Sequence, residues 1–354
     1  MLIFSRKYRQ LLGLDITTSS IKLIELSMAG GVYRVESYAA EPTPPNAMNE
    51  KTLVDPQAVG EAIRRAVKRS GAKSHEVAIA ISGDATITKV IQMPRGLREA
   101  DLEAQVEMQA DQYISFPMDE VSYDFEVLGN SETDSDSIDV LLVASRTDNV
   151  ETRRAAVTAA GLTARIVDVE AFALENACRL MTHQMPDGGI DHTVAVADFG
   201  ASSTTFSVLR NLKVVYTRDF AFGGQQLTEE IMRTYGLSLE EAGRAKKEGG
   251  LPANYQAEVL DPFIDDMTQQ VSRSLQFYLA SGSGREPPDK ILVCGGCANV
   301  PGVADVIQSR VGISAERGDP LGQMKLSSRA RAQAVQRDAT ALLTACGLAL
   351  RSFD

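Results

Sequence analysis

The sequence predicts an α/β protein made of two similar halves, with a separate α/β block inserted into the first half. Three observations lead to this prediction. The pattern Asp-x-x-x-Ser-Ser occurs at 15–20 and again at 198–203. Each copy lies in a run of short apolar strands that is followed by helices. Between the copies, from about residue 85, the order strand, helix, strand, strand, helix, strand forms a unit of its own.

The bulk composition is that of an ordinary globular protein. The chain has 354 residues, of which 44% are hydrophobic and 23% are charged, so it can bury a sizeable core. Its formal charge of −11 argues against binding to nucleic acid, which requires a basic face. Four cysteines over this length favour reduced thiols in the cytoplasm over a disulfide framework. No apolar run approaches the roughly 20 residues that a membrane-spanning helix needs.

The first ten residues allow two interpretations. Arg6, Lys7 and Arg9 lie between apolar stretches that are too short for a signal peptide. This segment either leads into the first strand or forms a small basic and apolar patch that touches a membrane surface.

The first half begins with a predicted antiparallel meander of three strands, which a proline-rich loop at 39–48 ends. A helix follows, with Asp55 as its N-cap, Pro56 in its first turn and Gly71 at its end. The predicted strands of this half cover 11–15, 21–26, 31–39 and 76–82.

The sequence pattern of the inserted block differs from that of the residues before it. An alternating strand ends at Pro94, and the next helix carries acidic residues on its exposed side. Two further strands are joined by the polar, acidic segment 130–137. The predicted elements are strands at 85–94, 121–129, 138–146 and 164–169 and helices at 98–114 and 147–161.

The second half repeats the opening pattern. A second three-strand meander is followed by two helices and by a long helix at 258–280. In the long helix Phe263, Met267, Val271 and other apolar residues recur at intervals of three and four, which is typical of a face packed on a core. A buried strand at 290–294 precedes a glycine pair and another helix. The last predicted element is an apolar helix near the end of the chain.

The repeated acidic bend has a chemical explanation. Successive backbone N–H groups in a tight turn can bind a polyphosphate, and small hydroxyl residues add donors. An acid before the turn repels phosphate, but it can hold the Mg²⁺ that accompanies ATP, normally through water. Asp15 and Asp198 could instead form Asx-turns at strand ends. Two copies favour the functional interpretation, because an unpaired carboxylate at the end of an apolar strand costs on the order of several kcal/mol.

A glycine pair near the C-terminus fits the same site. Gly295 and Gly296 follow a buried strand and precede a helix, where glycine lets a flat ring lie against the backbone. The neighbouring Cys294 and Cys297 could indicate a redox or zinc motif. A zinc site needs two more ligands, and the three histidines form no fitting pattern, so buried cysteines are the favoured interpretation.

This order of motifs resembles the superfamily of actin, Hsp70 and the sugar kinases. The inserted segment "LREADLEAQVEMQADQYISFPMDEVSYDFEVLG" resembles more specifically the PilM family of actin-like cytoplasmic proteins of type IV pilus assembly, which is related to the division protein FtsA. The resemblance implies an actin-like ATPase fold, in which two duplicated RNase H-like halves enclose a nucleotide cleft and an FtsA-type α/β subdomain is inserted.

The resemblance also implies four subdomains. The first covers 1–84 together with 169–190 and the C-terminal helix 339–354. The inserted subdomain covers 85–168. The second actin-like subdomain covers 191–225 and 288–338, and a helical subdomain over the nucleotide covers 226–287.

Site residues follow from the resemblance, position by position. Asp15 and Asp198 hold Mg²⁺, and Glu170 lies near the attacking water, although an acid favoured by the start of a helix is an equal alternative. Lys246 lies beside the base, although a solvated lysine is the alternative. Thr17 stands where glycine is usual, and Gly243 stands where relatives carry a ribose-binding glutamate. The remaining ATP-binding residues are Thr18, Ser19, Ser20, Lys22, Gly200, Ser202, Ser203, Thr204, Gly223, Gly224, Gly295, Gly296 and Asn299.

The resemblance implies a scaffold that binds ATP with slow or no hydrolysis. Its partner is the N-terminal cytoplasmic tail of a PilN-like inner-membrane protein, which lies in a groove between the first and inserted subdomains and serves pilus biogenesis and twitching motility. Contact with the membrane is then indirect, and self-association is possible. The alternatives are an FtsA-like filament-forming membrane tether, a small-molecule kinase and a binding module that has lost its nucleotide. The chain ends without the amphipathic tail of an FtsA tether, and no extra catalytic acid of a kinase is evident.

Overall fold

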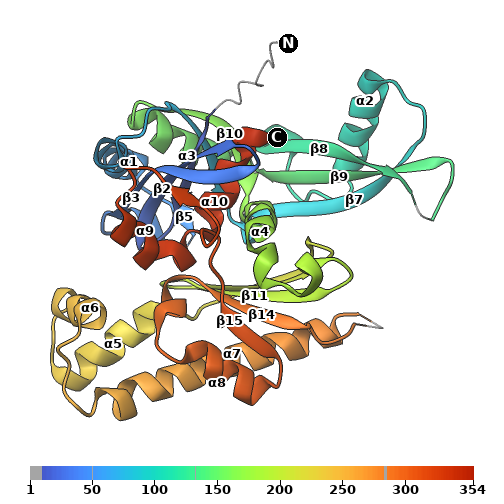
Figure 1. Ribbon diagram of the computed structural model, residues 1–354. Coiled ribbons are helices and arrows are strands. Elements are labelled where there is room, and N and C mark those ends of the chain that lie inside the picture. The colour runs from blue at the N-terminus through green and yellow to red at the C-terminus, as the bar shows by residue number, and fades with distance from the viewer. Residues whose placement is uncertain (1–9, 50, 132, 283–284) are drawn as a thin grey trace.

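A computed structural model of the chain describes residues 10–49, 51–131, 133–282 and 285–354. Two large sheets with their helices form an upper and a lower half, and a smaller sheet projects from the side of the upper half (Figure 1). The two interpretations of the N-terminal segment concern residues that lie almost entirely outside the described part of the chain. Within the described residues, no helix is both long and apolar enough to cross a membrane.

The first half contains a six-stranded sheet in the order β10-β6-β1-β2-β3-β16. Strands β1 to β3 form the predicted antiparallel meander, and β6 and β10 continue the sheet in parallel with β1. The strands are β1 Leu12–Ile16, β2 Ser20–Ala29, β3 Val32–Pro42, β6 Glu76–Ile81, β10 Thr163–Val169 and β16 Lys325–Leu326. A separate two-stranded hairpin, β4 Met48–Asn49 and β5 Thr52–Leu53, lies beside this sheet.

Alternating apolar residues give the first sheet two buried faces. Leu14 and Leu23 pack toward α1 (Pro56–Ser70) and α3 (Thr147–Ala159), while Ile24 and Leu26 pack toward α10 (Leu343–Leu350). The predicted start and end of α1 are confirmed. The side chain of Asp55 accepts the N–H of Ala58, and Gly71 ends the helix in the left-handed conformation.

The second half contains a five-stranded sheet in the order β13-β12-β11-β14-β15, which again places an antiparallel meander beside parallel strands. The strands are β11 Thr193–Phe199, β12 Thr204–Arg210, β13 Lys213–Phe220, β14 Lys290–Cys294 and β15 Ser314–Arg317. The helices are α5 Gly224–Tyr235, α6 Leu239–Glu248, α7 Asp261–Ala280 and α8 Val303–Val311. The predicted apolar face of α7 is buried with Phe199 and Phe206, and a π-helical turn, Gln256–Leu260, precedes this helix.

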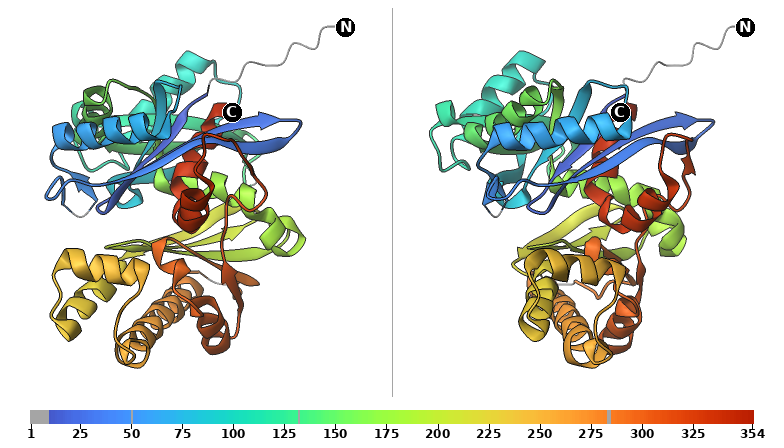
Figure 2. Two further views of the ribbon diagram at one scale, coloured as in Figure 1. Left: turned by 60° about the vertical axis from the view of Figure 1, so that its left-hand side comes forward. Right: turned by 90° about the vertical axis from the view of Figure 1, so that its left-hand side faces the viewer.

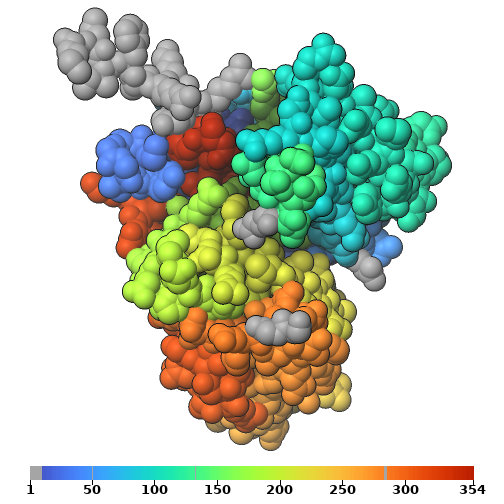
Figure 3. Space-filling view, turned by 90° about the vertical axis from the view of Figure 1, so that its right-hand side faces the viewer, coloured from blue at the N-terminus to red at the C-terminus, as the bar shows by residue number. Residues whose placement is uncertain are grey.

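The projecting unit is a three-stranded antiparallel sheet with one helix on one face. It consists of β7 Thr86–Pro94, α2 Glu99–Ala110, β8 Val121–Asn130 and β9 Ser137–Arg146, with β9 in the centre. In the space-filling view this unit, cyan to green, stands beside the first half and above the second half (Figure 3).

Contacts in the structure assign two of the predicted ranges to a different subdomain from the one that the sequence indicated. The sequence placed 147–168 in the inserted subdomain, but α3 packs against α1 and β10 pairs with β6, so both elements extend the first half. The sequence placed 325–338 in the second actin-like subdomain, but β16 pairs with β3, and α9 (Ala332–Asp338) contributes Val335 to the core beneath the first sheet. The C-terminal helix α10 packs against β1 and α4 (Glu170–Cys178), as expected for the first half. These two helices lie where the halves meet (Figure 2).

Candidate functional site

Two bends, one from each half, meet at the centre of the molecule. The first bend (17–19) joins β1 to β2, and the second bend (200–203) joins β11 to β12. The hydroxyl oxygens of Thr18 and Ser202 are 2.9 Å apart, although 184 positions separate them in the sequence. The structure therefore brings the two Asp-x-x-x-Ser-Ser patterns face to face.

The first bend is closed by the residue that stands in place of a usual glycine. The hydroxyl of Thr17 donates to the carbonyl of Ser20 at 2.9 Å, and the N–H of Thr17 donates to the same carbonyl at 3.1 Å. Within the described residues, the N–H groups of Thr18 and Ser19 have no acceptor. The bend thus has two adjacent backbone donors that no part of the described chain uses.

The second bend is supported from behind by the turn before α5. The N–H of Gly224 donates to the carbonyl of Gly200 at 3.0 Å, and a Cβ at Gly223 would lie 2.5 Å from the carbonyl oxygen of Ala201. Glycine at 223 is therefore required by close approach. Thr204, which the sequence assigned to phosphate binding, is fully buried, and its hydroxyl donates to the carbonyl of Phe222 at 2.7 Å. Its side chain supports the bend instead of facing the first bend.

The two acids differ in their surroundings. Asp15 Oδ2 lies 2.8 Å from Lys22 Nζ in a largely buried ion pair. Burial opposes the charged form of Lys22, but Asp15, together with the charges of Asp198 and Asp338, raises the pKa of the ammonium. The backbone of Asp198 is paired in the sheet, but its carboxylate has no hydrogen bond or ion pair among the described residues. Burial raises the pKa of Asp198 to about 6, and the charge of Asp15 adds to this effect while that of Lys22 opposes it.

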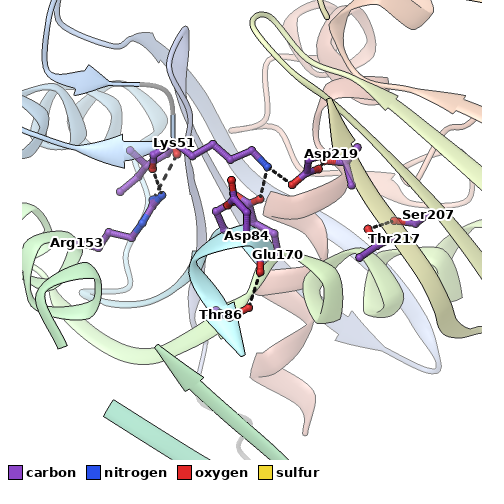
Figure 4. Close-up of polar contacts among 12 residues, drawn as sticks. Lys51, Asp84, Thr86, Arg153, Glu170, Ser207, Thr217 and Asp219 are labelled. Carbon is purple, nitrogen blue, oxygen red and sulfur yellow. Dashed lines mark hydrogen bonds and ion pairs between the residues drawn. The ribbon is translucent and has the colours of Figure 1, made fainter. Parts of the chain in front are cut away.

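Glu170 belongs to a cluster that joins the two halves (Figure 4). Lys51 Nζ lies 2.7 Å from Asp219 Oδ2 and 3.4 Å from Glu170 Oε2. Burial raises the pKa of Glu170, and the charges of Lys51 and Arg153 oppose this rise. The sequence analysis missed Lys51 and Asp219. Asp219 could have been found from strand register, because it pairs with Thr205, two residues after the second bend.

Of the glycine pair after β14, Gly295 closely approaches the end of β11, directly before the second bend. Gly295 has a φ of 85°, and a Cβ there would lie 2.2 Å from the carbonyl oxygen of Phe199 and 2.6 Å from Asp198 Oδ1. Gly296 faces open space. Asn299 is used within the protein, since its amide donates to the carbonyl of Arg337 and to the hydroxyl of Thr340.

The predicted base-side lysine and the cysteine pair are both held by protein contacts. Lys246 Nζ donates to the carbonyl of Gly224 and to the hydroxyl of Thr228, each at 2.7 Å, and burial lowers its pKa. Cys294 and Cys297 are buried free thiols, and burial raises the pKa of Cys297 to about 11. This agrees with the interpretation of buried, unreactive cysteines. Among the described residues, no three His, Cys, Asp or Glu side chains are grouped to hold a metal directly.

The comparisons with known proteins agree with the geometry. The family described as "Type IV pilus assembly protein PilM" matches residues 13–353. The chain belongs to this family. A solved structure described as the "PilM-PilN type IV pilus biogenesis complex" is 28% identical and covers 98% of this chain and 99% of that chain, with a TM-score of 0.79.

A second solved structure is similar to this chain in fold, and its low sequence identity carries no conclusion about function. The ethanolamine utilization protein EutJ from Carboxydothermus hydrogenoformans is 17% identical and covers 97% of this chain and 90% of that chain, with a TM-score of 0.55. The resemblance to the PilM family and the actin-like α/β fold predicted from the sequence are both confirmed. This PilM-family chain is thus an actin-like protein of type IV pilus assembly.

Proposed function

We propose that this PilM-family chain binds ATP with Mg²⁺ between its two bends. In this form it serves as a scaffold for the N-terminal cytoplasmic tail of a PilN-like inner-membrane protein, and so acts in pilus biogenesis and twitching motility. The observation that carries the nucleotide site is the contact between the bends, 2.9 Å from Thr18 to Ser202. The two turns come from distant segments of the chain, each carries several hydrogen-bond donors, and the two are in contact.

The bends fit a polyphosphate chemically. The N–H groups of Thr18 and Ser19 lack acceptors within the described chain, and Ser202 and Ser203 add hydroxyls from the opposite side. Phosphate oxygens accept such hydrogen bonds without needing a base or a metal from the protein. Because the bends touch each other, a triphosphate must part them when it enters.

The acids fit a hydrated magnesium ion. Asp15 is already neutralised by Lys22, whereas Asp198 has a raised pKa and no partner in the described chain. A cation that is bound through water beside Asp198 would supply the missing countercharge, and Mg²⁺ retains its waters readily. Bound Mg²⁺ would also screen the phosphates from both carboxylates.

The assignment of the partner rests on the family and on one complex. The similar solved structure is described as a complex of PilM with PilN, and its matched chain aligns with this one over nearly the full length of both. The formal charge of −11 on this chain suits a basic tail. We place the tail in the groove between the first half and the inserted unit. The protein would then lie on the cytoplasmic side of the inner membrane through this partner alone.

Titration calorimetry with ATP and Mg²⁺ tests the nucleotide site. Asp15→Ala and Asp198→Ala should each weaken binding by roughly ten-fold or more, because each removes a group near the cation or the phosphates. Asp266→Ala on the exposed side of α7 is the matched control and should bind as the wild type does. Unchanged affinity in both bend variants would rule out this site.

A fluorescent peptide tests the scaffold role. The peptide copies the cytoplasmic N-terminus of the PilN-like protein that occurs with this chain, and a scrambled peptide is the control. Polarisation should report specific binding that changes in affinity when ATP and Mg²⁺ are present. Phosphate release should be slow or absent. Rapid ADP release that depends on a sugar or on acetate would favour the kinase alternative instead.

A further inference from the structure

Lys51 links the two halves at a point away from the bends. It lies in the short turn between β4 and β5 of the first half, and its ammonium reaches Asp219 on β13 of the second half at 2.7 Å. The Lys51 and Asp219 side chains are only 21% and 25% exposed. The charges of Glu170 and Asp219 raise the pKa of Lys51 although burial opposes this, so the ammonium stays charged. We call Lys51 and Asp219 the cross-cleft pair.

Hydrogen bonds connect the cross-cleft pair to both bends. On the first side, Arg153 donates to the carbonyl of Lys51 at 3.1 Å and to the carbonyl of Ile16, directly before the first bend, at 3.5 Å. On the second side, Asp219 Oδ1 accepts the hydroxyl of Thr205, two residues after the second bend. The pair therefore moves with the elements that would hold the phosphates.

Lys51 has a second acidic neighbour, Glu170, whose carboxylate lies 3.4 Å from Lys51 Nζ. Glu170 begins α4 directly after β10, and α4 packs against both halves, with Ala173 in the core of the first and Leu174 and Cys178 in the core of the second. The lysine is thus held by one acid on the second half and by one acid at the junction of the halves.

Nucleotide entry requires the two halves to separate. The hydroxyls of Thr18 and Ser202 are in contact, so a triphosphate cannot lie between the bends while they remain closed. Because Lys51 and Asp219 belong to opposite halves, parting the bends also stretches the cross-cleft pair. A buried, charge-assisted bond resists such stretching more strongly than the neutral hydroxyl contact does.

We propose that Lys51 is a latch that holds the two halves closed and must release Asp219 before a nucleotide enters. The part of this proposal that concerns nucleotide rests on the proposed function; the part that concerns closure does not. The latch predicts that the rate of nucleotide entry is set by the cross-cleft pair, whereas the bends set the affinity for phosphate.

The closure is tested without nucleotide, by measuring the distance between spin labels on the two halves. Cysteines introduced at Lys68 on α1 and at Leu239 on α6 are suitable, because both sites are exposed and the four native cysteines are buried. Lys51→Met, which keeps the length of the side chain but not its charge, should lengthen or broaden the distance distribution. Asp219→Asn should do the same, and the double variant should add little.

Lys290→Met is the matched control. Lys290 pairs with Glu316 at 3.1 Å, its side chain is 19% exposed, and both residues belong to the second sheet. This variant removes a similar ion pair without crossing the cleft, so its distance distribution should equal that of the unmutated, labelled protein. An unchanged distribution in Lys51→Met would overturn the latch.

Entry is then measured by rapid mixing of the nucleotide-free protein with a fluorescent ATP analogue and Mg²⁺. Lys51→Met should bind the analogue roughly ten-fold faster than Lys290→Met does, which corresponds to the loss of one charge-assisted bond. Equal binding rates would overturn the control of nucleotide entry by the cross-cleft pair. If the wild type bound no analogue, the proposed function would be wrong, and the label distances alone would decide whether the latch exists.

Discussion

The two bends have the same sequence pattern, yet they hold their acids in opposite ways. Asp15 is paired with Lys22, and both side chains are largely buried. Asp198 has no partner within the described chain, its pKa is raised to about 6, and the backbone of Gly295 passes close to its carboxylate. The first acid thus contributes to the stability of the protein, whereas the second acid reduces stability until a cation neutralises it. This difference indicates that the two halves, although similar in strand arrangement, contribute differently at the point where the bends meet.

Removing each acid should have opposite effects on stability. Asp15→Asn leaves Lys22 buried without its partner and should lower the free energy of unfolding by about 3 kcal/mol. Asp198→Asn removes an unpaired carboxylate and should leave the free energy of unfolding at pH 7.5 unchanged or raised. Urea denaturation in EDTA measures both. Equal losses in the two variants would show that the bends are equivalent.

The backbone of Gly295 provides the next test of the comparison, because it supports the second bend. Gly295→Ala places a Cβ 2.2 Å from the carbonyl oxygen of Phe199 in a left-handed conformation, and should cost about 2 kcal/mol. Gly296→Ala is the adjacent control, since a Cβ there meets nothing within 4 Å. Thermal unfolding of the two variants should separate them clearly. Similar melting temperatures would contradict the close approach.

The sequence was sufficient to predict the bends because their chemistry is local. An acid, a tight turn and small hydroxyl residues lie within six positions, and repetition of that pattern made a shared ligand the favoured interpretation. The meanders and the cap of α1 were predicted for the same reason, since turn and cap residues act on their immediate neighbours.

Features that depend on contact between distant elements could not be predicted in this way. Lys51 and Asp219 are ordinary charged residues until the halves close. The hydroxyl of Thr204 turns toward Phe222 because β12 pairs with β13, which the pattern in the bend does not contain. Likewise, α3 has no local feature that assigns it to the first half; its packing against α1 does so.

The dependence of stability on pH should distinguish the two acids further. The folded-state pKa of Asp198 is raised from an ordinary value of 3.8 to about 6, so between about pH 4 and 6 the folded protein binds more protons than the unfolded chain does. This group therefore lowers stability as the pH rises through that window. Relative to Asp198→Asn, the wild type should lose on the order of 1–2 kcal/mol between pH 4.5 and 7.5. Urea titrations without Mg²⁺ measure this, and a difference that does not vary with pH would contradict the raised pKa.

The smallest effect concerns the contact between the bends themselves. Thr18→Val and Ser202→Ala each remove one hydroxyl of the 2.9 Å pair, and a double-mutant cycle should give a coupling free energy of about 1 kcal/mol in the protein without nucleotide. If a triphosphate parts the bends, the coupling should disappear when saturating ATP and Mg²⁺ are present. Thr205→Val with Ser202→Ala is the control cycle, because the hydroxyl of Thr205 bonds to Asp219 and not to the first bend. A coupling that persists at full strength with bound nucleotide would mean that the bends stay closed and that the phosphates lie elsewhere.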